Sequence, residues 1–227
     1  MSALILCYHK VGPVGEEGRS LNVEPRLLDS HVRFFKRRRC PFLTASRFSD
    51  RPFEDGVCLT FDDAYASTVS NGLDVLNRHG VKGTLYVVSD RAGKTSDWDA
   101  PTDRRLASVE DLRAAAKEGH EIGNHTKTHC RLDAVDDARL REEISGAHSQ
   151  LCKEGLRPLT ICYPYGAHDH RAVSEARLAG YEVGMSLLKG PVGTASDPMR
   201  LPRFVIAFSD SLPLLIYKTF VKPALRL

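Results

Sequence analysis

The chain has 227 residues, which is enough to bury one large hydrophobic core, and we expect residues 1–227 to form a single domain. Its 42% hydrophobic and 27% charged residues are ordinary for a globular protein. The 32 basic and 29 acidic residues leave a net charge of +3, which excludes the strongly basic class of nucleic-acid-binding proteins.

The first residues, MSALILCYHKVG, contain a short apolar run but no basic region before it and no small-residue cleavage site. This pattern is not typical of a secretory signal. No apolar stretch approaches the roughly 20 residues that span a bilayer, so we expect a cytoplasmic protein. The six cysteines form no Cys-x-x-Cys pair, and we expect buried, reduced thiols.

Short β-rich runs alternate with longer amphipathic runs along the chain. In chain order, the predicted elements are a strand in ALILCYH (3–9), a helix near 25–39, a strand in VCLTFD (57–62), a helix near 66–79, a strand in GTLYVV (83–88), a helix near 108–118, a strand in HEIGNH (120–125), a helix near 136–154, a strand in LTICYPY (159–165), a helix near 170–179, and strands in EVGMSLL (182–188) and RFVIAF (203–208). This alternation predicts a parallel sheet with helices outside, either doubly wound or closed as a barrel.

Informative polar residues follow the predicted strands, where a parallel sheet binds its ligands. Asp62 and Asp63 end one strand, and two adjacent carboxylates either lie in water or hold a cation. His125 and His129 follow another strand, and on a helical turn their spacing places both imidazoles on one side. Two histidines and one carboxylate form a metal set that leaves a position open for water. Histidines bonded locally in the core or at the surface are the alternative.

The segment YPYG follows the strand near residues 159–163. Pro164 and Gly166 predict a tight turn, which would aim the N–H of Tyr165 into the site. A turn that only ends the strand is the alternative. The longest segment without a predicted element, SDRAGKTSDWDAP (89–101), is expected to form a lip over the site.

In their order along the chain, LTFDDAY, GNHTKTH and YPYG resemble the motifs of the polysaccharide deacetylase or NodB-homology family, the fourth carbohydrate-esterase family. The resemblance implies an α/β fold, a distorted parallel (β/α) barrel of about seven strands, and metal-dependent removal of an acetyl group from a sugar. By position it implies Asp62 as the general base, Asp63, His125 and His129 as metal ligands, and Pro164 and Tyr165 as substrate contacts, with the Tyr165 N–H as oxyanion donor. The expected cofactor is one divalent ion, zinc first, with cobalt, nickel or iron as alternatives.

The sequence departs from the family pattern at the proton donor for the leaving amine. No histidine follows Tyr181, whereas the family carries one late in the chain. Some relatives are circularly permuted and have this histidine on the first strand, which favours His9. His168 and His170 are the alternatives.

Two further positions differ. Cys162 replaces the arginine of the family. Arg203 is a candidate to position Asp62 instead, and we group it with the substrate contacts. The alternative is that Arg203 is a surface arginine. Ala64 replaces the glycine that commonly follows the two aspartates, which predicts right-handed backbone there.

The residues favour a deacetylase of an N-acetylated sugar over an amidase of the same fold acting on a non-sugar bond, and over a non-catalytic carbohydrate-binding relic. With one tryptophan and no secretion signal, a cytosolic glycan, a nucleotide sugar or a lipid-linked sugar is favoured over a long wall polymer. The oligomeric state is not readable from the sequence.

The last segment, SDSLPLLIYKTFVKPALRL (209–227), predicts a helix that starts at Ser211 and packs through an apolar stripe. A final helix that closes the barrel is the favoured interpretation. The alternative is a weak contact with a membrane surface. That contact would use a second apolar set, Leu214, Tyr217 and Val221, and three basic residues, Lys218, Lys222 and Arg226.

Overall fold

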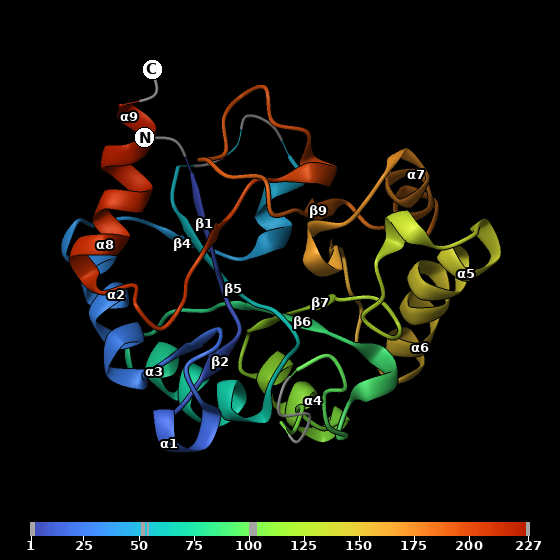
Figure 1. The fold of residues 1–227 in the computed structure, drawn as a ribbon, viewed down its shortest axis with the longest axis horizontal. Helices are drawn as coiled ribbons and strands as arrows, with labels where there is room; N and C mark the ends of the chain where they lie inside the picture. The colour runs from blue at the N-terminus through green and yellow to red at the C-terminus, as the bar shows by residue number, and fades with distance from the viewer. Residues whose placement is uncertain (1–2, 51–52, 54, 100–103, 226–227) are drawn as a thin grey trace.

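A computed structural model of the chain describes residues 3–50, 53, 55–99 and 104–225. Its main sheet is parallel throughout and curls into an open barrel surrounded by helices (Figure 1). In spatial order its strands are β10 (Phe204–Val205), β1 (Leu4–Tyr8), β5 (Val57–Phe61), β6 (Thr84–Val87), β7 (Glu121–Asn124), β8 (Thr160–Cys162) and β9 (Val183–Met185), and β4 (Phe42–Leu43) also pairs with β5. A separate pair joins β2 (Lys10–Val11) to β3 (Asn22–Val23). The predicted distorted parallel barrel is confirmed.

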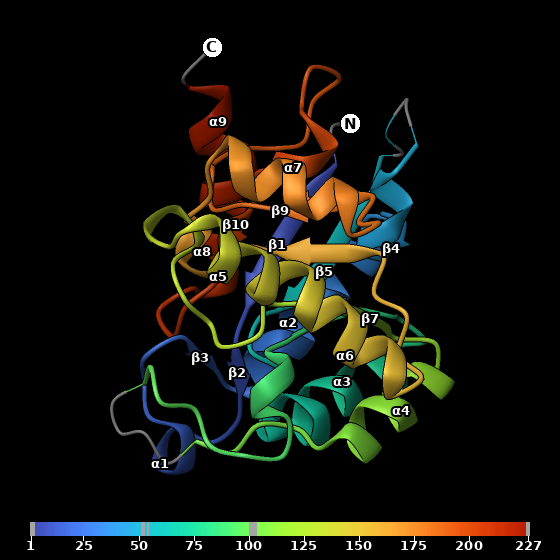
Figure 2. The same ribbon diagram turned by 90° about the vertical axis from the view of Figure 1, so that its right-hand side faces the viewer.

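Helices connect successive strands around the outside of the sheet (Figure 1), and Figure 2 shows α5, α6 and α7 along one side. The α-helices are α1 (Val14–Glu17), α2 (Pro25–Arg37), α3 (Leu73–Arg78), α4 (Val109–Lys117), α5 (Asp137–Arg141), α6 (Ala147–Lys153), α7 (His170–Leu178), α8 (Leu212–Ile216) and α9 (Lys222–Ala224). Single π-helical turns precede α3 (Thr68–Gly72), join α5 to α6 (Glu142–Gly146) and join α8 to α9 (Tyr217–Val221). Short 3₁₀ turns lie at Ala45–Phe48, Ser89–Arg91, Leu132–Ala134, Pro164–Gly166 and Pro198–Arg200. None of the helices in the described ranges is long and apolar enough to cross a bilayer.

Local sequence explains where the longer helices begin. The Ser108 hydroxyl accepts from the Asp111 N–H at 3.1 Å while the Asp111 carboxylate accepts from the Ser108 N–H at 2.9 Å, so a capping box starts α4. At α5 the Asp136 carboxylate accepts from the Arg139 N–H, and at α7 the Asp169 carboxylate accepts from the Ala172 N–H. Each forms a one-way cap without the reciprocal bond of the capping box. These caps fix the residue at which each of the three helices begins.

The strands are buried on both faces, as parallel strands covered by helices require. Alternate residues of β1, such as Leu4 and Leu6, pack outward on the helices, whereas Ile5 packs into the barrel interior. Cys7 shares the parity of Ile5 and therefore also points inward. All six cysteines are free thiols, and three are buried, but Cys152 is exposed, which corrects the expectation of burial for that residue.

His31 joins the first strand to the C-terminal part of the chain. Its Nδ1 lies 3.0 Å from the Tyr8 hydroxyl and its Nε2 lies 3.0 Å from the Asp210 carbonyl oxygen. The ring is fully buried. Burial lowers the pKa of His31 to about 4, because its charged form would lose hydration inside the core.

We predict that this histidine makes the protein less stable as the pH falls from about 6.5 to about 4. The unfolded chain binds a proton on His31 below about 6.5, whereas the folded chain stays neutral until the lower pKa, so protonation favours unfolding in that window. Between pH 7 and 5 His31→Gln should remove about 2 kcal/mol of the loss in unfolding free energy measured with urea. The exposed His170→Gln is the matched control and should leave the slope unchanged. Equal slopes for wild type and His31→Gln would contradict the prediction.

Candidate functional site

The polar residues predicted from the sequence gather at the carboxyl ends of β5, β7 and β8. Asp62 and Asp63 follow β5, and the segment with His125 and His129 follows β7. All four side chains are buried, with exposed fractions between 2% and 7%. Buried carboxylates require compensating partners, and each aspartate has a different one.

Asp63 faces the two histidines. Its Oδ1 lies 3.5 Å from Nε2 of His125 and 3.2 Å from Nε2 of His129. Two atoms that each lie about 2.0–2.1 Å from a tetrahedral zinc ion are about 3.3 Å apart, so this spacing fits a shared ion. Among the described residues, Asp63 Oδ1 has no hydrogen-bond partner.

The protonation of His125 supports the same interpretation. Its Nδ1 lies 2.7 Å from the Cys162 carbonyl oxygen, which can only accept, so Nδ1 carries the proton and Nε2 keeps its lone pair. Burial lowers the pKa of His125 to about 4. Burial alone would raise the pKa of Asp63, but its contacts with His129 and His125 lower it to about 2. A neutral imidazole and an ionised carboxylate, with lone pairs facing each other, form a suitable donor set for a cation.

The two histidines do not lie on a helical turn. Residues 125–129 form a non-helical bend in which Thr126 and His129 have φ values of 68° and 65°. The Thr126 hydroxyl accepts from the His129 N–H at 3.1 Å and holds the bend closed. The helical rationale for the spacing was therefore wrong, although the two imidazoles do meet.

The side chain of Glu143 holds this bend through hydrogen bonds, and this residue was not predicted from the sequence. The buried carboxylate accepts from the N–H of Lys127 at 3.0 Å, from the N–H of Thr128 at 2.8 Å and from the Thr128 hydroxyl at 2.6 Å. Arg139 neutralises it at 2.6 Å. The available signal was an acidic residue on the apolar stripe of the helix predicted near 136–154, where a carboxylate needs a partner.

Asp62 has a different partner, the guanidinium of Arg203. Two parallel contacts join them, Nη1 to Oδ1 at 2.7 Å and Nη2 to Oδ2 at 2.8 Å, and Nη1 also donates to the Thr60 hydroxyl at 3.0 Å. Burial opposes ionisation of Asp62, but Arg203 holds the pKa of that carboxyl well below its usual range. Arg203 is 1% exposed, so it is not a surface arginine. This burial also argues against the predicted substrate contact of Arg203.

Two thiols complete the surroundings of Asp62. Sγ of Cys7 lies 3.3 Å and Sγ of Cys162 lies 3.4 Å from Oδ2. Burial raises the pKa of both thiols, which therefore stay protonated and donate to the carboxylate. Nη2 of Arg203 lies 3.0 Å from Cys162 Sγ, so the cysteine occupies the place beside the guanidinium.

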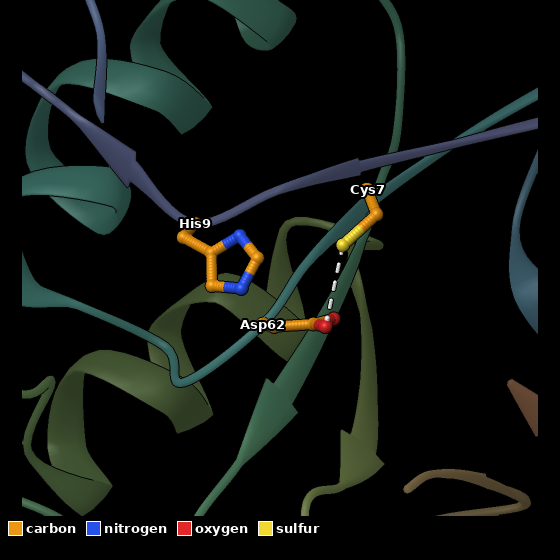
Figure 3. A group of neighbouring side chains, drawn as sticks. All are labelled: Cys7, His9 and Asp62. Carbon is orange, nitrogen blue, oxygen red and sulfur yellow. Dashed lines mark hydrogen bonds between the residues drawn. The ribbon is translucent and has the colours of Figure 1, made fainter. Parts of the chain in front are cut away.

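His9 follows β1 and lies next to Asp62 (Figure 3). The side chains of Cys7, His9 and Asp62 each present a ligand atom within 4.8 Å of the others. The His9 Nδ1 has no hydrogen-bond partner in the described part of the chain. Because Arg203 already neutralises Asp62, this trio is a weaker cation site than the Asp63 set.

The other two candidate histidines are placed differently. His168 bonds through Nδ1 to the Gly166 carbonyl oxygen at 2.8 Å and stacks on Tyr163 with ring centroids 4.6 Å apart. His170 is exposed at the start of α7. Of the three histidines considered as proton donors, His9 is therefore the one that the fold places near the two aspartates.

Ala64 adopts left-handed backbone with φ of 50°, and Asp63 has φ of 67°. The expectation of right-handed backbone at Ala64 was wrong. The carbonyl oxygen of Ala64 accepts from the Ala107 N–H at 2.9 Å, which holds the chain in a conformation that alanine alone disfavours.

Aromatic rings cover the site. Trp98, in the predicted lip, stacks on His129 with centroids 4.2 Å apart, and Tyr165 meets His129 edge-on at 4.8 Å. The Tyr65 hydroxyl bonds to Asp99 in the same lip. Residues 100 and 101, which end the predicted lip, lie outside the described residues.

The turn after β8 is as tight as predicted. Tyr165 has φ of 59°, between Pro164 and Gly166, and its side chain is 52% exposed. The role of its N–H as an oxyanion donor stays a prediction.

We predict that Glu143 sets the metal affinity of the site through the bend that carries His129. Glu143→Gln loses an acceptor for the amides of Lys127 and Thr128, and zinc affinity measured by competition with a chelating dye should fall about 10- to 100-fold. The matched control is Glu142→Gln, the same charge change on the exposed side of the same turn, which should change affinity less than about threefold. Unfolding without metal shows whether the variants fold. Unchanged affinity in folded Glu143→Gln would contradict the prediction.

Comparison with known proteins agrees with the geometry. Residues 50–184 match the model of a family described as polysaccharide deacetylase. The chain is 23% identical over 193 residues to YxkH of Bacillus subtilis, named as a polysaccharide deacetylase, covering 82% of this chain and 64% of that protein. It is 30% identical over 126 residues to a chitin deacetylase of Pestalotiopsis sp., covering 55% of this chain and 39% of that protein. The chain thus spans less than two-thirds of the length of these curated relatives.

A solved structure shares the fold almost completely. Streptococcus pyogenes deacetylase PplD, in complex with acetate, superposes with a TM-score of 0.82 at 19% identity, covering 96% of this chain and 98% of that chain. At this identity the likeness concerns the fold alone.

Proposed function

The chain belongs to the polysaccharide deacetylase family, and from this we propose that it hydrolyses the acetamide bond of an N-acetylated sugar. The observation that supports the proposal is that the two adjacent aspartates have different partners. Asp63 faces two imidazoles, whereas Asp62 faces Arg203 and His9. One carboxylate can hold a metal while the other moves a proton. We further propose that residues 1–227 form one catalytic domain.

Asp63, His125 and His129 would hold one divalent ion, zinc first, with cobalt, nickel or iron as alternatives. When bound, such an ion supplies Lewis acidity, which polarises the acetyl carbonyl and lowers the pKa of water. The ligand atoms are already directed toward one point, so little reorganisation is needed on binding.

Asp62 would take the proton from the attacking water. Arg203 engages one lone pair of each carboxylate oxygen, and both thiols donate to Oδ2, so Oδ1 keeps a lone pair for this proton. The Tyr165 N–H would donate to the oxygen that becomes negative when the carbonyl is attacked. Such a donor contributes about 3 kcal/mol.

His9 would donate a proton to the leaving amine. The reaction cleaves the C–N bond, forms a C–O bond to the water oxygen, and releases acetate and the sugar amine. His9 lies beside Asp62 in the trio of Figure 3, where a ring nitrogen and a carboxylate oxygen are within 4.8 Å of each other. One group can therefore accept and another can donate a proton without moving far.

The aromatic rings near His129 support a sugar as the substrate. Tyr165 is half exposed and Trp98 is partly buried, and such rings offer an apolar face with a polar edge to a sugar ring. The relatives named above include a chitin deacetylase and a deacetylase bound to acetate. A soluble glycan, a nucleotide sugar and a lipid-linked sugar all remain within the proposal.

Acetate release tests the activity. We expect the zinc-loaded protein to release acetate from at least one member of a panel of N-acetylglucosamine conjugates, and a chelator should abolish release. Asp62→Asn should keep the zinc content but lower kcat by about 10²- to 10⁴-fold, whereas His125→Ala should lose both. Release from non-sugar acetamides alone would refute the sugar substrate. Loss of zinc in Asp62→Asn would reverse the roles of the two aspartates.

The role of His9 is testable through the leaving group. His9→Ala should keep zinc, lose the basic limb of the pH–rate profile, and lower N-deacetylation far more than hydrolysis of 4-nitrophenyl acetate, whose leaving group needs no proton. His170→Ala is the control and should change neither. Equal losses on both substrates would exclude His9 as the proton donor.

A further inference from the structure

A second concavity lies between the C-terminal helix and the segment that follows β9. Its volume is about 560 Å³, within the range of small-molecule sites. We name it the C-terminal groove, and its walls are formed by residues Leu187, Lys189, Gly190, Pro191, Arg203, Phe204, Val205, Ala207, Lys218, Lys222 and Pro223. None of these lining residues is acidic.

The walls of the groove are largely apolar and its rim is positive. Leu187, Phe204 and Val205 supply hydrophobic surface. Lys218 is neutralised by the buried Asp210 at 2.6 Å. Lys189 and Lys222 are exposed and have no carboxylate partner among the described residues, so both charges are available to an anion.

An apolar stripe runs along the outer face of the helix beside the groove. Of seven large hydrophobic side chains exposed in the described ranges, four lie within two positions of a groove-lining residue in the sequence, namely Leu188 after β9, and Tyr217, Val221 and Leu225 in the C-terminal segment. The last three are spaced four residues apart, from the start of the π-helical turn Tyr217–Val221 to the residue after α9. We call these four residues the outer stripe.

The inner face of the same helix is already used by the fold. Leu215 and Thr219 are buried, and Phe220 packs against Phe34 and Phe35 of α2. The residues of the outer stripe on this helix are therefore not on the face that packs against the fold. Lys222 directly follows Val221 in the sequence. An exposed apolar face bordered by lysines is typical of a helix that lies on an anionic bilayer.

We propose that the C-terminal groove and the outer stripe dock on a membrane that contains anionic phospholipid, with one acyl chain in the groove and its phosphate between Lys189 and Lys222. Charge complementarity selects this occupant. A second copy placed on the same surface by a two-fold axis would bring these lysines against each other, which costs free energy.

The groove begins near the amino end of β1 and follows β10, and Arg203, whose guanidinium pairs with Asp62, forms part of its wall. The N–H of Val192, directly after the groove wall, donates to the Ala3 carbonyl oxygen at 2.9 Å, before the amino end of β1, whereas His9 follows its carboxyl end. Vesicle binding is measured without substrate, so the docking proposal can fail or succeed separately from the proposed deacetylation.

Co-sedimentation with vesicles tests the docking surface. The full chain should bind vesicles of phosphatidylcholine mixed with phosphatidylglycerol at low salt, bind weakly at high salt, and not bind phosphatidylcholine alone. Lys189→Glu with Lys222→Glu should weaken binding at least about tenfold. The matched control reverses two exposed lysines on other helices, Lys117→Glu with Lys153→Glu, and should weaken binding less than about threefold.

Tyr217→Ser with Val221→Ser keeps the charges and removes the middle of the outer stripe. This variant should also lose at least about tenfold in vesicle binding while its unfolding midpoint and acetate release stay as in wild type. Vesicle binding that survives both groove variants, or that both lysine pairs weaken equally, would overturn the proposal. Dimerisation that these variants abolish, or uptake of monomeric lysolipid without vesicle binding, would also overturn it.

Discussion

The buried ion pair between Asp62 and Arg203 is the contact on which the site depends. It joins the carboxyl end of β5 to the residue before β10, 141 positions later, inside a barrel that offers little water to either charge. Neither residue can be removed alone without leaving an uncompensated charge, which costs about 3–5 kcal/mol. The small side chain of Cys162 leaves room for the guanidinium to arrive from β10 rather than from β8.

The proposed metal ligands depend on a second buried carboxylate outside the barrel. Glu143 binds two backbone amides and a hydroxyl of the bend between His125 and His129, and it does so from a π-helical turn. Single π turns inside helices are frequent at functional sites, and this one carries the buried Glu143. Two acidic residues with different partners thus fix the two halves of the site, one through β10 and the other through α5 and α6.

Sequence reasoning was most reliable where a pattern repeats. The alternation of buried strands and amphipathic helices predicted the parallel barrel, and the ordered motifs indicated the family. Sequence reasoning failed where the backbone conformation of one or a few residues decides how side chains are placed. The four-residue spacing of His125 and His129 fits a helix and a tight bend equally well, and only the contact with Ala107 explains why Ala64 is left-handed. The candidate pairing of Arg203 with Asp62 is present in the structure, whereas Glu143 could not be paired with the bend from spacing alone, because tertiary packing brings it there.

Backbone conformation is unusually costly at this site. Among the described residues, seven non-glycine residues have positive φ, and five of them belong to the site: Asp63, Ala64, Thr126, His129 and Tyr165. Each such conformation costs about 1–2 kcal/mol relative to an ordinary one, and the hydrogen bonds and ion pairs around the site must outweigh this. The geometry of the site thus carries a cost in conformational free energy that the rest of the fold has to offset. Under the proposed function, laboratory evolution for heat resistance alone is expected to act on these five positions at the expense of activity.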